Sequence, residues 1–101
     1  MTPWSVAYSR QFHGQLEGLA PTTYARVEES IDVLSANPGL ARPYDPPYEA
    51  ACPPQPCLCY AVPKTTKVLF LVADGRAHTI KVFFMADARM DPHRRFESLE
   101  W

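Results

Sequence analysis

One stretch, residues 64–96, limits the fold of this 101-residue chain more than any other. It reads KTTKVLFLVADGRAHTIKVFFMADARMDPHRRF and holds two apolar runs at residues 68–73 and 80–85. Both runs are rich in β-branched and aromatic residues and too short for free-standing helices, so they predict strands. Asp74-Gly75 separates them, and this dipeptide favours a positive φ, which predicts a hairpin. We expect this hairpin to lie in the middle of a sheet.

The first part of the chain predicts one short strand and two helices. Residues 4–8 (WSVAY) alternate weakly in polarity, as a strand does, and Ser9 then offers the side-chain oxygen of a helix N-cap. The apolar side chains of the first helix repeat at helical spacing: Phe12, Leu16 and Leu19. A second helix begins near Pro21, with threonines at 22–23 as capping candidates, and ends at 37–39. Its apolar stripe comprises Tyr24, Val27, Ile31 and Leu34.

Prolines crowd the next segment. Seven of the eleven prolines lie between residues 37 and 56, and each has a restricted φ and no N–H donor. The segment therefore cannot be a helix or a central strand, and we expect an ordered loop or an edge of the sheet. Residues 57–62 (CLCYAV) follow as a further strand, which Pro63 closes.

The resulting order is strand, helix, helix, strand, strand, strand, which predicts a small α+β fold. We expect an antiparallel core sheet with the two helices packed as a hairpin against one face. A chain of 101 residues can bury one modest core, so we expect residues 1–101 to form a single domain.

Composition limits the cofactors and the cellular compartment. Cys52, Cys57 and Cys59 lie within eight positions, with no fourth Cys and no His nearby to complete a tetrahedral metal site. We therefore expect reduced thiols that pack as small apolar side chains, and no metal or cofactor. No apolar run is long enough to cross a bilayer and the N-terminus lacks the regions of a signal peptide, so we expect a cytoplasmic protein with no membrane partner.

The formal net charge of −1 hides an uneven distribution. Residues 1–50 carry three basic and six acidic side chains, whereas residues 51–96 carry seven basic and three acidic ones. This asymmetry allows an anion-binding surface on the second half of the chain, although solvated sheet edges also collect Lys and Arg.

The motifs of the chain resemble those of the RelE/ParE superfamily of bacterial type II toxins. The similarity rests on the order of elements, on LSANP at the end of the second helix, on CLCYAVPKTTKVLFLVADG, on HTIKVFFM and on DARMDP. The resemblance implies a RelE/ParE-like toxin that a co-encoded antitoxin neutralises in a hetero-oligomer. RelE-like members cut mRNA in the ribosomal A site, whereas ParE-like members inhibit DNA gyrase without cutting RNA.

The resemblance also implies a metal-independent cleavage chemistry, in which a 2′-OH of the RNA attacks the adjacent phosphate. Lys67 matches a family position often held by a phosphate-binding arginine, and Arg89 matches the arginine thought to stabilise the transition state. His93 lies near the C-terminus, where several members carry a functional Tyr or His. These three residues are the catalytic candidates.

Further residues are candidates for binding the RNA. Tyr60 falls about where RelE-like enzymes have a catalytic lysine, and Lys64 lies in a turn where family members place basic residues. The set of RNA-binding candidates is Lys64, Lys81, Arg94, Arg95, Phe96 and Tyr60. The basic side chains have an ordinary alternative role as solvated charges, and Arg89, which Asp87 and Asp91 flank, has one in a surface ion pair.

Three functions stay open on these residues. A RelE-like, ribosome-dependent mRNA endonuclease is favoured by the basic second half and by the three catalytic candidates. A ParE-like gyrase inhibitor, which acts by binding alone, is favoured by the absence of a lysine pair on the 57–62 strand and by the near-neutral charge. A non-catalytic interaction domain is the third. All three predict an antitoxin as partner; the first adds the ribosome and mRNA, and the second adds DNA gyrase.

Overall fold

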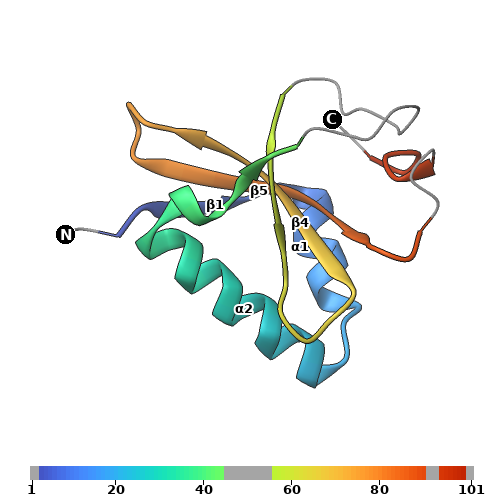
Figure 1. The fold of residues 1–101 in the computed structure, drawn as a ribbon. Coiled ribbons are helices and arrows are strands. Elements are labelled where there is room, and N and C mark those ends of the chain that lie inside the picture. The colour runs from blue at the N-terminus through green and yellow to red at the C-terminus, as the bar shows by residue number, and fades with distance from the viewer. Residues whose placement is uncertain (1–2, 45–55, 91–93, 100–101) are drawn as a thin grey trace.

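The computed structural model describes residues 3–44, 56–90 and 94–99, and within them the chain forms one five-stranded sheet with two α-helices (Figure 1). The helices are α1 (Arg10–Glu17), α2 (Pro21–Ala36) and the short 3-10 helix η1 (Pro38–Leu40). The strands are β1 (Ser5–Tyr8), β2 (Arg42–Pro43), β3 (Leu58–Ala61), β4 (Lys67–Asp74) and β5 (Thr79–Asp87), in the spatial order β1-β5-β4-β3-β2. The α+β fold that the order of elements predicts is confirmed.

The central hairpin of β4 and β5 forms as the two apolar runs predict, and its turn is longer than the two-residue turn that an Asp-Gly dipeptide typically forms. Residues 75–78 lie between the strands, and Asp74 Oδ1 accepts hydrogen bonds from the backbone N–H groups of Arg76 and Ala77 at 3.0 and 3.2 Å. The positive φ falls on His78, at 50°, and not on Gly75. The Asp74 carboxylate stabilises this longer turn because it binds N–H groups that lie outside the strand ladder.

One extra residue in β5 shifts the register of the hairpin. Phe70 of β4 lies opposite Phe84. The next residue of β4, Leu71, lies opposite Val82, so Phe83 has no partner in β4. This β-bulge changes which residues of β5 face each side of the sheet. As a result, even-numbered positions of β5 face the helices before the bulge, and an odd-numbered position does so after it.

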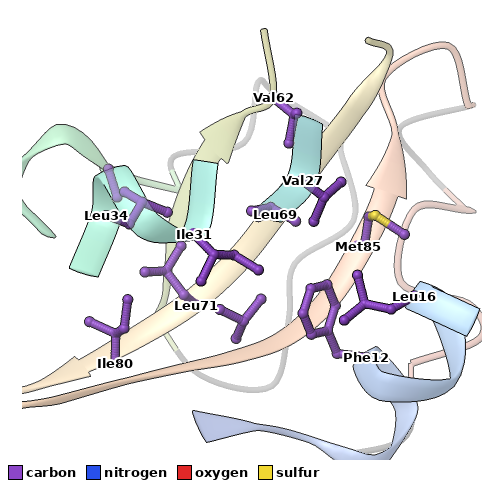
Figure 2. Close-up of a cluster of buried hydrophobic side chains, with 12 residues drawn as sticks. Phe12, Leu16, Val27, Ile31, Leu34, Val62, Leu69, Leu71, Ile80 and Met85 are labelled. Atoms are coloured by element: carbon purple, nitrogen blue, oxygen red, sulfur yellow. The ribbon is translucent and has the colours of Figure 1, made fainter. Parts of the chain in front are cut away.

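Both helices cover the same face of the sheet (Figure 2). The side chains buried between the helices and the sheet form the helix-side core, which comprises Phe12, Leu16, Val27, Ile31, Leu34, Ala41, Val62, Leu69, Leu71, Ile80, Val82 and Met85. The apolar stripes predicted for the two helices therefore face the sheet as expected, except that Tyr24 is exposed.

The N-terminus of α1 is capped as the sequence predicts, whereas that of α2 is not. Ser9 Oγ accepts a hydrogen bond from the backbone N–H of Phe12 at 3.1 Å. The N-cap of α2 is Ala20, which has no side chain that can accept a bond, and the helix begins at Pro21. The predicted caps at 22–23 lie inside the first turn instead.

β1 makes the sheet mixed, where the sequence led us to expect antiparallel strands. It pairs in parallel with β5, and the long stretch of chain between β1 and β5 makes the crossover that parallel strands need. Where β1 ends, Gln15 of α1 continues the pairing. Its Nε2 donates to the carbonyl oxygen of Met85 at 2.8 Å and its Oε1 accepts from the Met85 N–H at 2.9 Å. The antiparallel core of β3, β4 and β5 is confirmed.

The opposite side of the sheet, the far face, has a smaller core of its own. Its buried residues, the far-face core, are Cys57, Phe70, Phe83, Phe84 and Ala86. Tyr44, Phe96 and Leu99 pack against them from outside the sheet. The proline-rich segment supplies β2, an edge strand as predicted, while its residues 45–55, with Cys52, lie outside the described part of the chain. Among the described helices, none is long and apolar enough to cross a membrane.

Candidate functional site

Two of the three catalytic candidates meet at one carboxylate. Lys67 begins β4 and lies opposite Asp87, the last residue of β5. The Lys67 Nζ is 3.7 Å from Asp87 Oδ2, and the Arg89 guanidinium approaches the same carboxylate through Nε at 3.1 Å and Nη2 at 3.0 Å. Asp87 thus holds both cations at the end of the hairpin, and the surface ion pair considered for Arg89 is present.

Further donors surround the Asp87 carboxylate. Thr66 Oγ1 donates to Oδ2 at 2.9 Å, and the backbone N–H of Arg89 donates to Oδ1 at 2.9 Å. The hydrogen bonds from Arg89, together with that from Thr66, hold the pKa of Asp87 well below its usual range, and the same contact raises the pKa of Arg89. A carboxylate of lowered pKa is a poor proton acceptor near neutral pH, and the contacts of Asp87 orient the two cations.

The Arg89 side chain remains accessible in spite of this contact. It is 77% exposed, and Nε and Nη2 are the groups that bind Asp87. A guanidinium carries five N–H groups in a planar fork, so others remain to contact a second anion. Asp87 therefore fixes one edge of the Arg89 fork, and the rest of the fork faces solvent.

Tyr60 and Lys64 lie beside α2, on the same side of the sheet as the helices. Tyr60 packs against the helix-side core, and both residues border a small pocket of about 120 Å³. The rest of its lining is Arg26, Glu29, Ser30, Val33 and Pro63. Lys64 has a positive φ of 63° in the turn between β3 and β4. These two candidates therefore face α2.

Lys81 is separated from the Asp87 cluster along the hairpin. It lies opposite Val72, five positions beyond Lys67 on β4, and is exposed. At about 3.4 Å per residue this is roughly 17 Å along the strand. Lys81 and the Asp87 cluster cannot contact the same phosphate.

The C-terminal candidates lie on a different part of the molecule. Phe96 forms edge-to-face contacts with Tyr44 and Phe70, with ring centroids 5.5 and 4.9 Å apart, and so packs onto the far-face core. Arg95 Nη1 donates to Tyr44 Oη at 3.2 Å, while Arg94 Nε is paired with Glu97 at 2.7 Å. His93 lies outside the described residues. The predicted site residues are thus distributed over several regions and do not form one cluster.

Two cysteines of the far face were expected to be reduced and buried. Cys57 and Cys59 are free thiols, the first buried and the second half-buried. Burial raises the pKa of Cys57 to about 11. Burial also raises the pKa of Cys59, and the positive charges of Arg95 and Arg42 oppose that rise. No group of three or more metal-ligating side chains comes together among the residues that the structure describes.

Sequence reasoning missed Thr66 and Arg42. Thr66 binds Asp87 at the open end of the β4–β5 hairpin, and the pairing of these two strands brings them together. Arg42 lies on β2 opposite Cys59 and borders a pocket of about 520 Å³.

Solved structures of toxin–antitoxin complexes contain this fold. A chain of the toxin–antitoxin complex RelBE2 from Mycobacterium tuberculosis aligns with a TM-score of 0.67 at 19% identity, over 86% of this chain and 93% of that one. A chain of the archaeal RelE–RelB complex from Pyrococcus horikoshii OT3 aligns with a TM-score of 0.69 at 14% identity, over 90% of this chain and 100% of that one. The sequence matches no protein-family profile, and a search of curated protein sequences found no relative. The structural likenesses confirm the predicted RelE-like fold.

Proposed function

We propose that this chain is the toxin of a type II toxin–antitoxin system and that its partner is an antitoxin. The support is the fold, which spans nearly the whole of a chain in each of two toxin–antitoxin complexes. Exposed apolar side chains would give such a partner a surface to cover. Among the described residues, the large exposed ones are Tyr8, Tyr24, Val33, Leu40 and Met90.

The activity that we propose is metal-independent, ribosome-dependent cleavage of mRNA in the cytoplasm. The observation that carries it is the Arg89 guanidinium, which Asp87 holds on one edge while most of the side chain is exposed. When a 2′-OH attacks the adjacent phosphate, negative charge develops on the pentavalent phosphorus group. A guanidinium oriented in advance stabilises that charge without reorganising, and Lys67 adds a second positive charge beside it.

The reaction also needs a group that protonates the departing 5′-oxygen. Asp87 is excluded because its lowered pKa keeps it ionised. We assign both proton transfers to His93, since an imidazole can take the proton of the attacking 2′-OH and give a proton to the departing 5′-oxygen near neutral pH. His93 lies four positions after Arg89 in the sequence.

Toeprinting of translating ribosomes with purified protein tests this proposal. Wild-type protein should cut mRNA at the A site, and Arg89→Ala and His93→Ala should each lower the cleavage rate at least tenfold. Arg76→Ala is the matched control, because Arg76 lies in the turn at the opposite end of the hairpin. An absence of wild-type cleavage at any concentration, without antitoxin present, would contradict the endonuclease assignment.

A gyrase inhibitor that acts by binding is the second candidate, and one observation favours it. Asp87 pairs with both Lys67 and Arg89 and so offsets part of their positive charge, which suits a surface that binds without catalysing. A DNA supercoiling assay separates the two candidates, because inhibition of gyrase without ribosomal cleavage supports this one. A third class, a non-catalytic interaction domain, predicts that expression of the chain alone leaves bacterial growth unchanged.

A further inference from the structure

Thr66 lies immediately before β4, where two hydrogen bonds hold it beside the end of β5. Its carbonyl oxygen accepts from the backbone N–H of Ala88 at 2.6 Å, which extends the pairing of the two strands by one position. Its Oγ1 donates to Asp87 Oδ2 at 2.9 Å. The turn before it is held as well, because Thr65 Oγ1 accepts from the Lys67 N–H at 3.0 Å. The sheet therefore places the Thr66 hydroxyl against one oxygen of Asp87.

Thr66 differs from the other groups around the Asp87 carboxylate in the part of the chain from which it comes. The backbone N–H, Nε and Nη2 groups that donate to this carboxylate all belong to Arg89, two positions further along the chain. The Lys67 Nζ lies 3.7 Å from Oδ2, which is beyond hydrogen-bond distance. Among the residues that the structure describes, Thr66 is thus the one hydrogen-bond donor that ties this carboxylate to the β4 side of the hairpin.

The orientation of the Asp87 carboxylate depends on this tie. The terminal torsion of an aspartate side chain is broad, so the carboxylate and the guanidinium that it binds could turn together. A hydrogen bond from the opposite strand removes much of that freedom, because it fixes the position of Oδ2 relative to the sheet. The Asp87 side chain is 24% exposed and that of Arg89 is 77% exposed. The series of contacts from Thr66 to Arg89 therefore begins at a covered site and ends in solvent.

We propose that Thr66 is a positioning residue for RNA cleavage: its hydroxyl fixes the Asp87 carboxylate, which holds the Arg89 guanidinium where charge develops on the phosphate. This deepens the endonuclease assignment and rests on it. A guanidinium that is held in place stabilises the transition state without reorganising, whereas one that swings must be ordered in each reaction. Thr66 acts through Arg89 and needs no contact with the RNA. Loss of its hydroxyl should slow the chemical step and leave binding to the ribosome unchanged.

Cleavage of mRNA on stalled ribosomes, with the purified full chain in excess, measures the maximal rate and the protein concentration that gives half of it. Thr66→Val keeps the shape of the side chain without the hydroxyl and should lower the maximal rate about tenfold. The half-saturating concentration should stay within about twofold, because the lost interaction acts in the transition state. Thr66→Ser keeps the hydroxyl and should retain most of the rate. Thr79→Val is the matched control, because the Thr79 hydroxyl binds the Ala77 carbonyl oxygen at the opposite end of the hairpin.

Two further measurements distinguish positioning from a general effect on the fold. In the Arg89→Ala background, Thr66→Val should change the rate by less than about twofold, since the group that Thr66 positions is gone. NMR of the isotope-labelled chain follows the hydrogen exchange of the Arg89 Nε–H with solvent. This exchange should be about fivefold faster in Thr66→Val, the change expected for the loss of one neutral hydrogen bond. The NMR measurement requires neither ribosomes nor cleavage, and thermal unfolding establishes that each variant is folded.

Several results would overturn the proposal. They are a Thr66→Val variant that cleaves as fast as Thr79→Val, a Thr66→Ser variant as slow as Thr66→Val, a raised half-saturating concentration at an unchanged maximal rate, an equal loss of rate in the Arg89→Ala background, or an unchanged exchange of the Arg89 Nε–H. If the wild-type protein does not cleave mRNA but the exchange is faster in Thr66→Val, the endonuclease assignment is refuted and the link from Thr66 to Arg89 is upheld. Wild-type cleavage that Thr66→Val leaves unchanged refutes the positioning role alone.

Discussion

Ser9 joins α1 to the bulge in β5, and we predict that Ser9→Ala lowers the free energy of unfolding by about 2 kcal/mol. Its Oγ accepts from the Phe12 N–H at 3.1 Å and donates to the carbonyl oxygen of Phe83 at 2.9 Å. Loss of an N-cap costs about 1 kcal/mol, and loss of a hydrogen bond to a carbonyl costs about 1 kcal/mol more. For a chain of this size each kcal/mol lowers Tm by about 4–8 °C, so the fall should be about 8–16 °C.

Three variants separate the two bonds. Ser9→Thr keeps the hydroxyl and should stay within about 0.5 kcal/mol of wild type. Ser9→Asp keeps the oxygen that caps α1 but cannot donate to Phe83, so it should lose about 1 kcal/mol, half of the alanine effect. Urea unfolding monitored by circular dichroism and by tryptophan fluorescence measures all three. If Ser9→Asp is as stable as wild type while Ser9→Ala is not, the bond to the bulge contributes nothing and our account of Ser9 is wrong.

Three further perturbations test the core and the titrating groups. Leu34 is fully buried, and Leu34→Ala should lower the free energy of unfolding in urea by about 3 kcal/mol. Val33, the adjacent residue, is exposed, and Val33→Ala should change that free energy by less than about 0.5 kcal/mol. Equal effects would contradict the assigned faces of α2. Because the pKa of Cys57 is raised in the folded state, the thiol of the unfolded chain loses its proton first as the pH rises, and the free energy of unfolding should fall from about pH 9 to about pH 11. Cys57→Ala should reduce that fall, and a variant with the same pH profile as wild type would show that Cys57 does not cause it. Because the pKa of Asp87 is lowered in the folded state, its contribution to the free energy of unfolding is present above about pH 4 and is lost as the pH falls further. Asp87→Asn should weaken this loss of stability in acid in the same unfolding assay, and an unchanged loss would show that the contacts of Asp87 do not stabilise the fold.

The elements that the sequence predicts well are those with a local physical cause. The apolar runs of β4 and β5, the helical spacing of Val27, Ile31 and Leu34, and the Ser9 cap each depend on residues a few positions apart. The prolines likewise restrict their own backbone, which is why an edge strand was foreseeable at β2. Even the Arg89–Asp87 contact follows from neighbours two positions apart.

Other features depend on pairings that bring distant residues together, and only the tertiary structure decides them. The parallel addition of β1, the bulge at Phe83 and the amide of Gln15 in the place of a strand result from how separate elements dock.

The candidate site shows the same division between local and long-range causes. The sequence by itself determined the type of its residues, because basic side chains near the ends of strands are visible in the chain. Only the structure decided which of these side chains contact the same carboxylate, since residue spacing carries no information on contacts across a sheet. Lys67 and Arg89 meet through Asp87, whereas Arg95 binds Tyr44 on the far face.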